Sequence, residues 1–67
     1  MSERLKNRLR EFRNARNLTQ ADLAVLAGVS RKTINTVENG VFIPSTVLAL
    51  RLAQTLETTV EELFQLA

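Results

Sequence analysis

The sequence lacks several residue types on which catalysis and cross-linking often depend. It contains no Cys, His, Tyr or Trp, and its only Asp is Asp22. Without Cys or His there are no disulfides and none of the usual zinc sites, so an apolar core must stabilise the 67 residues. Acid–base or nucleophilic catalysis would have to rely on Glu, Lys and Ser alone, so we do not expect an enzyme.

Long apolar runs are also missing. The N-terminus has no apolar signal segment, and no run of apolar residues approaches the length that spans a membrane. The lack of Cys agrees with a reducing compartment. We therefore expect a cytoplasmic protein with one domain over residues 1–67, no membrane association, no cofactor or metal, and no evident small-molecule ligand.

Positive and negative charges are unevenly distributed along the chain, although the net charge is only +2. Residues 1–32 contain eight of the nine Lys and Arg residues and three acidic residues, whereas residues 33–67 contain one Arg and four Glu. A basic N-terminal half favours a polyanionic partner such as nucleic acid. Charge alone leaves open the alternative that these residues form ordinary solvated helix faces.

Residues 19–39 have the pattern of two short helices joined by a tight turn. Thr19 and Ser30 suit the N-cap positions of the two helices, and Gly28 suits the left-handed position between them. The apolar residues expected to share one core are Leu23, Ala24, Ala27, Val29, Ile34 and Val37. The second helix, residues 31–39, then presents a polar outer surface, as in a helix-turn-helix whose second helix enters the DNA major groove.

The outer surface of that second helix carries the residues that we expect to contact bases. Because Ile34 and Val37 face inward, helical rotation turns Arg31, Lys32 and Asn35 outward. Arginine suits a bidentate contact with guanine and asparagine one with adenine, while lysine suits either a base or a phosphate.

An ordered series of short motifs along the chain resembles one family. The series comprises residues 9–13, Asn17-Leu18-Thr19-Gln20, Gly28-Val29-Ser30, Glu38-Asn39-Gly40, Pro44-Ser45 and residues 60–64. It covers nearly the whole chain and resembles the Cro/repressor-like (XRE-type) DNA-binding domains, the group of the lambda and 434 phage repressors. The resemblance implies an all-α, compact five-helix lambda-repressor-like domain in which helices two and three form the helix-turn-helix.

The resemblance also implies roles for residues outside the proposed reading helix. In the family, the glutamine at Gln20 contacts the DNA backbone and supports the next helix; the alternative is an ordinary first-turn polar residue. Arg13 is expected to pair with Glu38 and tie helix one to the reading helix, whereas the alternative is that it extends to water. Phe42 is expected to pack back on the core.

The DNA-binding surface is expected to include polar residues around the reading helix. Arg10 belongs to it if helix one reaches the DNA backbone. Thr33 and Thr36 suit contacts with the backbone or a thymine methyl group, although ordinary helix surface explains them equally well. The complete expected set is Arg10, Gln20, Ser30, Arg31, Lys32, Thr33, Asn35 and Thr36.

Three further helices complete the expected fold. Helical spacing of apolar residues predicts helix one over residues 3–16, helix four over residues 46–56 and helix five over residues 60–66. The expected caps are Ser2, Ser45 and a capping box formed by Thr59 and Glu62.

The C-terminal half has more apolar residues than one small core requires. Those expected at a dimer interface are Val41, Ile43, Val47, Leu50 and Phe64. A homodimer formed there would leave both basic halves facing a two-fold symmetric operator. We therefore expect a transcriptional regulator, a repressor that occupies promoter DNA; the alternative is an antitoxin-type or adaptor module whose apolar residues bind a different protein.

Overall fold

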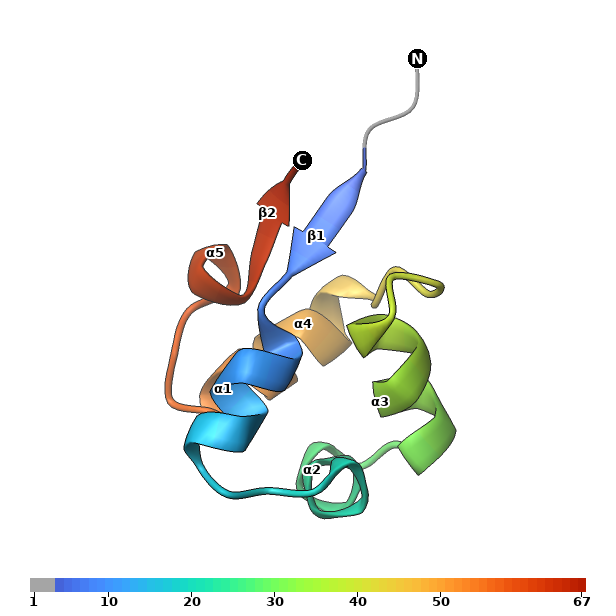
Figure 1. The fold of residues 1–67 in the computed structure, drawn as a ribbon, viewed down its shortest axis with the longest axis vertical. Coiled ribbons are helices and arrows are strands. Elements are labelled where there is room, and N and C mark those ends of the chain that lie inside the picture. The colour runs from blue at the N-terminus through green and yellow to red at the C-terminus, as the bar shows by residue number, and fades with distance from the viewer. Residues whose placement is uncertain (1–3) are drawn as a thin grey trace.

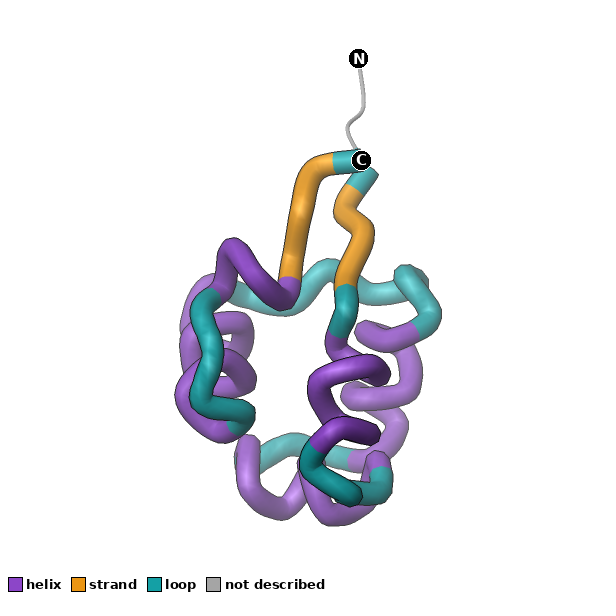
Figure 2. The backbone as a smooth tube through the Cα atoms, turned by 60° about the vertical axis from the view of Figure 1, so that its left-hand side comes forward, coloured by secondary structure: helices purple, strands orange, loops and turns teal. Residues whose placement is uncertain are grey.

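The computed structural model describes residues 4–67, which form five helices and a two-stranded sheet (Figure 1). The elements are β1 (Leu5–Asn7), α1 (Leu9–Ala15), α2 (Gln20–Ala27), α3 (Arg31–Glu38), α4 (Thr46–Thr55), α5 (Val60–Leu63) and β2 (Phe64–Leu66). The two strands are antiparallel neighbours and project together from one end of the helical body, as Figure 2 shows. None of the helices within residues 4–67 is long and apolar enough to cross a membrane.

Side-chain caps begin four of the five helices at the predicted positions. The hydroxyl groups of Thr19, Ser30, Ser45 and Thr59 each accept a hydrogen bond from the backbone N–H three residues later. A complete capping box forms at Thr19, because the Asp22 carboxylate also accepts from the Thr19 N–H at 2.9 Å. The helices therefore start where local side-chain chemistry satisfies their first backbone donors.

Helix one is shorter than predicted, because residues 5–7 form β1 instead of its first turns. The side chain of Asn7 accepts a hydrogen bond from the Leu9 N–H at 3.1 Å, and such a local bond competes with helix continuation. Strand β1 pairs with β2 in the register Leu5 to Leu66 and Asn7 to Phe64. The expected cap Ser2 lies outside the described residues, and the all-α prediction holds only approximately.

Helix five is also shorter than predicted, because it ends at Leu63 and the chain becomes extended at Phe64. The side-chain amide of Gln65 donates to the carbonyl oxygens of Glu61 and Glu62, both at 2.7 Å, and so satisfies the last turn of α5. Only the Thr59 half of the predicted capping box forms. The Glu62 carboxylate lies instead 3.5 Å from the Arg8 guanidinium.

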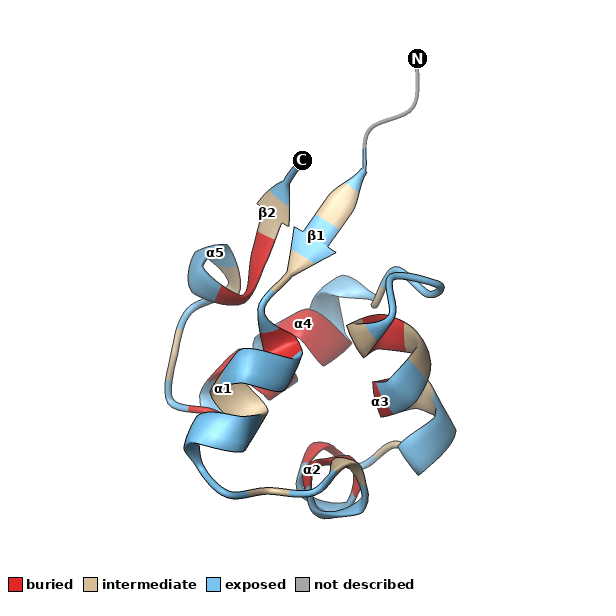
Figure 3. Ribbon diagram, in the orientation of Figure 1, coloured by how far each residue is buried: buried red, intermediate tan, exposed pale blue. Residues whose placement is uncertain are grey.

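The core lies between the helices and consists of apolar side chains only (Figure 3). Its residues are Leu9, Leu23, Ala24, Ala27, Ile34, Val37, Leu48, Ala49, Leu52, Ala53, Leu56, Leu63 and Phe64. The predicted helix-turn-helix core is therefore confirmed, with Val29 half-buried at its edge.

Of the predictions about aromatic residues, the one for Phe42 is wrong. Phe42 does not return to the core and is 47% exposed. The N–H groups of Val41 and Phe42 both donate to the Thr36 carbonyl, at 2.9 and 3.2 Å, and this turn leaves both side chains outside. Phe64, expected at a dimer interface, is only 8% exposed and packs in the core, although it also lines an open groove at the surface.

Candidate nucleic-acid interface

The turn between α2 and α3 is closed by backbone hydrogen bonds. Gly28 adopts a left-handed conformation (φ 71°, ψ 32°), which glycine reaches without steric cost, and the Val29 N–H donates to the Ala24 carbonyl at 2.9 Å. Arg51 on α4 donates to the Ala27 carbonyl at 3.2 Å, so its cation lies at the C-terminus of α2. These contacts set the direction in which α3 leaves the turn.

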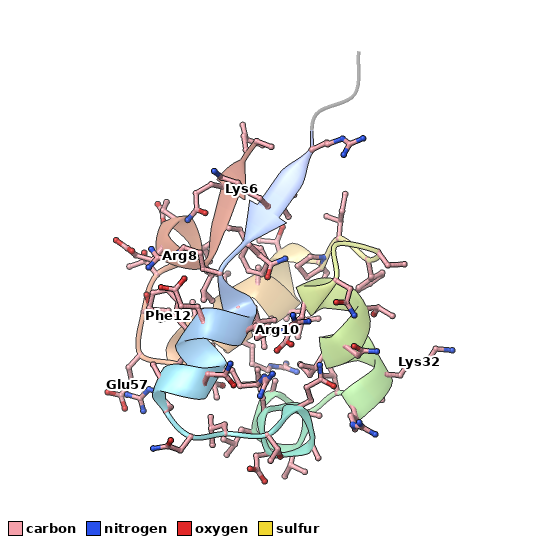
Figure 4. All side chains as sticks on the ribbon, in the orientation of Figure 1. Lys6, Arg8, Arg10, Phe12, Lys32 and Glu57 are labelled. Carbon is pink, nitrogen blue, oxygen red and sulfur yellow. The ribbon has the colours of Figure 1, made fainter. Side chains whose placement is uncertain are left out.

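Helix α3 buries one face and exposes the other, as predicted. Ile34 and Val37 are buried, whereas Arg31, Lys32 and Asn35 are exposed. The side chain of Lys32 extends away from the body of the protein in Figure 4. The exposed face therefore carries two cations and one amide within its first five residues.

The three hydroxyl residues expected to contact DNA are occupied in local hydrogen bonds. Ser30 Oγ accepts from the Thr33 N–H at 3.1 Å and lies 3.0 Å from Thr33 Oγ1. Thr36 Oγ1 donates to the Thr33 carbonyl at 3.0 Å. Ser30 is exposed, whereas Thr33 and Thr36 are half-buried. These contacts order the first turns of α3.

The last residue of α3, Glu38, carries a fully buried side chain. Arg13 from α1 donates to its carboxylate through Nε at 2.6 Å and Nη2 at 3.3 Å, and through Nη1 to the Leu18 carbonyl at 2.8 Å. The structure thus contains the pair that the family resemblance implied. Because the guanidinium also binds the chain just before α2, this pair joins α1, α2 and α3.

Two more side chains donate to the same carboxylate. Gln20 Nε2 lies 3.1 Å and Arg10 Nε 3.2 Å from Glu38 Oε1. Both residues were expected to face DNA, and both instead have part of their polar surface committed to Glu38. Arg10 lies between α1 and α3 in Figure 4, and its side chain remains half exposed.

The hydrogen bonds continue from the buried carboxylate to the exposed face of α3. Gln20 Nε2 also lies 3.4 Å from Asn35 Oδ1, which accepts a shorter bond of 2.8 Å from Asn39 Nδ2. Asn39 Oδ1 in turn accepts from Arg10 Nη2 at 3.0 Å. We call this group the amide network, and its members are Arg10, Arg13, Gln20, Asn35, Glu38 and Asn39.

Sequence analysis did not predict two asparagines that hold α3 in place, Asn39 and Asn7. Asn39 lies four residues after Asn35 on one helix face, a spacing that places the two amides in contact. Asn7 Nδ2 donates to the Val37 carbonyl at 3.0 Å and so links β1 to the C-terminus of α3. The first contact follows from helical spacing, but the second joins residues 30 apart and has no local signal.

Folding brings together charges that the sequence keeps apart. Arg16 pairs with Glu57 at 3.0 Å, and Arg8 lies 3.5 Å from Glu62 in addition to pairing with its near neighbour Glu11 at 2.9 Å. Among residues 4–67, the cations without a salt bridge are Arg4, Lys6, Arg31, Lys32 and Arg51. The positive charge facing solvent on α3 is thus unneutralised, whereas both cations of α1, Arg10 and Arg13, are paired.

The ionisation of Glu38 depends on its partners. Burial by itself raises the pKa of the Glu38 carboxyl. Hydrogen bonds from Arg13, Gln20 and Arg10 act in the opposite direction and, with the charge of Arg13, hold the pKa below its ordinary value. The carboxylate is therefore ionised at neutral pH and able to accept all four hydrogen bonds.

A short α2–turn–α3 unit with a cationic, exposed second helix is the architecture of DNA-binding transcription regulators. A family model described as helix-turn-helix (HTH_3) matches residues 9–63. The chain belongs to this XRE-type helix-turn-helix family, which confirms the resemblance drawn from its motifs.

Relatives of known sequence or structure agree with this assignment. An uncharacterized HTH-type transcriptional regulator from Methanocaldococcus jannaschii is 43% identical over 60 residues, covering 90% of this chain and 91% of the relative. YgzD of Bacillus subtilis, described in the same words, is 32% identical over 92% of this chain and 94% of its own length. The crystal structure of the restriction-modification controller protein C.AhdI from Aeromonas hydrophila superposes with a TM-score of 0.78, at 42% identity over 82% of this chain and 83% of that chain.

The first prediction concerns the stability that the buried carboxylate provides. Glu38→Ala leaves Arg13 buried without its partner, so we expect the free energy of unfolding at pH 7 to fall by roughly 3–5 kcal/mol. The pKa of Glu38 is lower in the folded protein than the ordinary glutamate value of 4.5. The stabilisation by this carboxylate is therefore fully present above pH 4.5 and is lost as the pH falls through the pKa of the folded state. Chemical denaturation of both proteins between pH 7 and pH 2 measures this difference.

The control for this prediction is Glu11→Ala, which removes an exposed carboxylate that also pairs with an arginine. We expect it to change stability very little, because solvent screens such a pair. Equal stabilities of Glu38→Ala and Glu11→Ala at pH 7 would contradict a stabilising role for the buried carboxylate.

Proposed function

We propose that this protein is a sequence-specific transcriptional regulator that binds a two-fold symmetric operator as a homodimer, with α3 in the major groove. The observation that carries the proposal is the outward face of α3. Arg31, Lys32 and Asn35 are exposed together there, on a helix whose opposite face is held by the core and by Glu38. Rigid support of a reading helix favours selective base contacts over adaptable, unselective ones.

The residues of this interface are proposed to do different work. Arg31 suits a bidentate contact with guanine, and Lys32, whose side chain extends away from the body of the protein in Figure 4, suits a base or a phosphate. Gln20 and Arg10 are proposed to contact the DNA backbone with the polar atoms that the amide network leaves available. Within residues 4–67, for example, Arg10 Nη1 makes no hydrogen bond. Ser30, Thr33 and Thr36 contribute by ordering α3.

The proposed dimer forms through an apolar surface away from α3. An open groove of about 490 Å³ is lined by Leu5, Pro44, Thr46, Ala49, Leu50, Val60, Glu61 and Phe64. Ile43 and Val47, which neighbour lining residues in the sequence, and Leu66, which pairs with Leu5, are exposed, as is Val41 in the loop before Pro44. Exposed apolar surface of this kind is typical of an interaction site. Strands β1 and β2, α4 and α5 supply the groove, so a second copy bound there leaves α3 accessible.

Repression is proposed to act by simple occupancy. With α3 in the major groove, bound protein would exclude other proteins from promoter DNA. The similarity to a restriction-modification controller protein supports a role in gene control. The controller protein and this chain are 42% identical in the aligned region.

The second prediction concerns base reading by Arg31. Binding-site selection from random duplexes with the purified protein yields the preferred operator. Arg31→Ala should weaken binding to that operator by roughly 1–3 kcal/mol, with a smaller loss on a scrambled duplex, because a lost base contact affects the preferred sequence most. Fluorescence anisotropy at fixed salt measures both affinities.

Lys6→Ala is the matched control, because it removes one positive charge from an exposed side chain of β1 that lies well apart from Lys32 of α3 in Figure 4. It should weaken binding to both duplexes slightly and equally. If Arg31→Ala behaves in the same way as Lys6→Ala, Arg31 does not read bases.

The third prediction concerns assembly through the apolar groove. Leu50 is 53% exposed at the groove, so Leu50→Glu should leave the fold intact while placing a charge in the proposed interface. We expect the parent to sediment as a dimer at micromolar concentration and Leu50→Glu as a folded monomer. Val25→Glu is the control, because Val25 is 81% exposed on α2, outside the groove.

A parent protein that is monomeric at micromolar concentration, both alone and on operator DNA, would exclude the homodimer. The groove would then be available to a different protein, as in an antitoxin or adaptor. Circular dichroism of each variant verifies that a change in sedimentation reflects assembly rather than unfolding.

A further inference from the structure

The amide network determines which atom of Asn35 faces solvent. A side-chain amide presents either a carbonyl oxygen, which accepts hydrogen bonds, or an NH₂ group, which donates them. The partners of an amide decide which end points in which direction. In this network the two ends of the hydrogen-bond chain are groups that cannot reverse their role.

At one end, Arg10 is a donor only, because a guanidinium has no acceptor. The Asn39 atom that it contacts at 3.0 Å must therefore be Oδ1. The nitrogen of Asn39 then points toward Asn35 and donates over 2.8 Å, so the Asn35 atom facing it must be Oδ1.

At the other end, Glu38 is an acceptor only when ionised. The Gln20 atom that contacts it at 3.1 Å must therefore be Nε2. The same nitrogen lies 3.4 Å from Asn35, a long contact whose polarity again requires Oδ1 of Asn35. Two routes that start from opposite charges thus assign the same orientation to one amide.

The orientation leaves Asn35 with an unusual set of available atoms. Its oxygen accepts from Asn39 and Gln20, which occupies both lone pairs of a carbonyl oxygen. Its Nδ2 group makes no hydrogen bond within residues 4–67, and the residue is exposed. The two N–H donors of Asn35 are therefore the groups that it can offer to a ligand.

We infer that Asn35 reads DNA as a hydrogen-bond donor only. It contacts an acceptor on a base edge, which is N7 of a purine, O6 of guanine or O4 of thymine. It does not accept from the amino group of adenine or cytosine, so the bidentate adenine contact usual for asparagine is not available to it. This inference rests on the proposed docking of α3 in the major groove.

Modified operators test the inference with the unaltered protein. Asn35→Ala first identifies the base pair at which selectivity is lost. At that pair, 7-deazapurine removes N7, 2-aminopurine in place of guanine removes O6, and 5-methyl-2-pyrimidinone in place of thymine removes O4. Separate operators lack the exocyclic amino group of adenine or cytosine. Each operator is also measured with Asn35→Ala, which corrects for changes in the duplex itself.

Removal of one acceptor should weaken binding by the parent about tenfold relative to Asn35→Ala, and removal of the amino group should produce no such difference. A loss on removal of the amino group would overturn the inference. If Asn35→Ala keeps its selectivity while Arg31→Ala loses it, the donor role of Asn35 is wrong but the proposed function is supported. If neither variant changes selectivity, both the donor role of Asn35 and the proposed docking of α3 are wrong.

Asn39→Asp provides a second test, because it changes the polarity of the network with almost no change in shape. Aspartate keeps an oxygen for Arg10 but places an acceptor against Asn35 Oδ1, where the shorter of its two hydrogen bonds was made. The remaining contact of that oxygen with Gln20 is long, at 3.4 Å, so we expect the Asn35 amide to rotate and turn its oxygen outward. A repeated site selection should then shift the preference at that base pair about tenfold toward a base that presents an amino group.

Asn39→Leu is the control for this variant. It removes the donor without supplying an acceptor, so the preference should weaken without reversing. Selection of the same base by the parent and by Asn39→Asp would overturn the inference. Melting curves verify that both variants are folded. If either variant is unfolded, the modified operators, measured with the unaltered protein, still test whether Asn35 acts as a donor only.

Discussion

The buried carboxylate of Glu38 is the constraint on which the arrangement of the first three helices depends. Removing an ionised carboxylate from water costs several kcal/mol unless hydrogen bonds and a counter-charge replace its hydration. Here four hydrogen bonds do so, two of them from Arg13. Because their donors come from α1 and α2, a displacement of either helix relative to α3 would break hydrogen bonds to a buried charge, and a displacement of α1 would also remove its counter-charge.

This constraint acts on the surface as well as on the interior. Gln20 and Arg10 each contact Glu38 on one side and an asparagine of the α3 surface on the other. The exposed amide of Asn35 is therefore oriented by a charge buried beneath it. The exposed amide of Asn35 is thus an extension of the interior polar network, whereas Arg31 and Lys32, which make no salt bridge within residues 4–67, are placed by their position on the helix.

Those parts of the structure that depend on local chemistry could be predicted from the sequence. The four side-chain caps, the left-handed Gly28 and the apolar spacing of α2 and α3 each follow from a few neighbouring residues. The Arg13–Glu38 pair was available only through family resemblance, because 25 residues separate its members. The exposed face of α3 followed directly from helical rotation.

The features that sequence analysis missed depend on long-range contacts. Strand β1 pairs with β2 at the other end of the chain, and Leu5 fits the apolar spacing of a helix as well as that of a strand. Phe42 lies outside because backbone bonds to Thr36 turn the loop, which its hydrophobicity does not reveal. Nor does charge order in the sequence predict that Arg16 and Glu57 meet.

The central claim is that the buried carboxylate orients the reading surface in addition to stabilising the fold. The most direct test is the ratio of operator affinity to scrambled-duplex affinity for Glu38→Gln, measured below its melting temperature. Glutamine keeps the shape of the side chain but turns an N–H group toward donors, so Gln20 and Arg10 lose their fixed orientation. We predict that the ratio falls about tenfold in the folded protein. A folded Glu38→Gln variant with the ratio of the parent would contradict the claim.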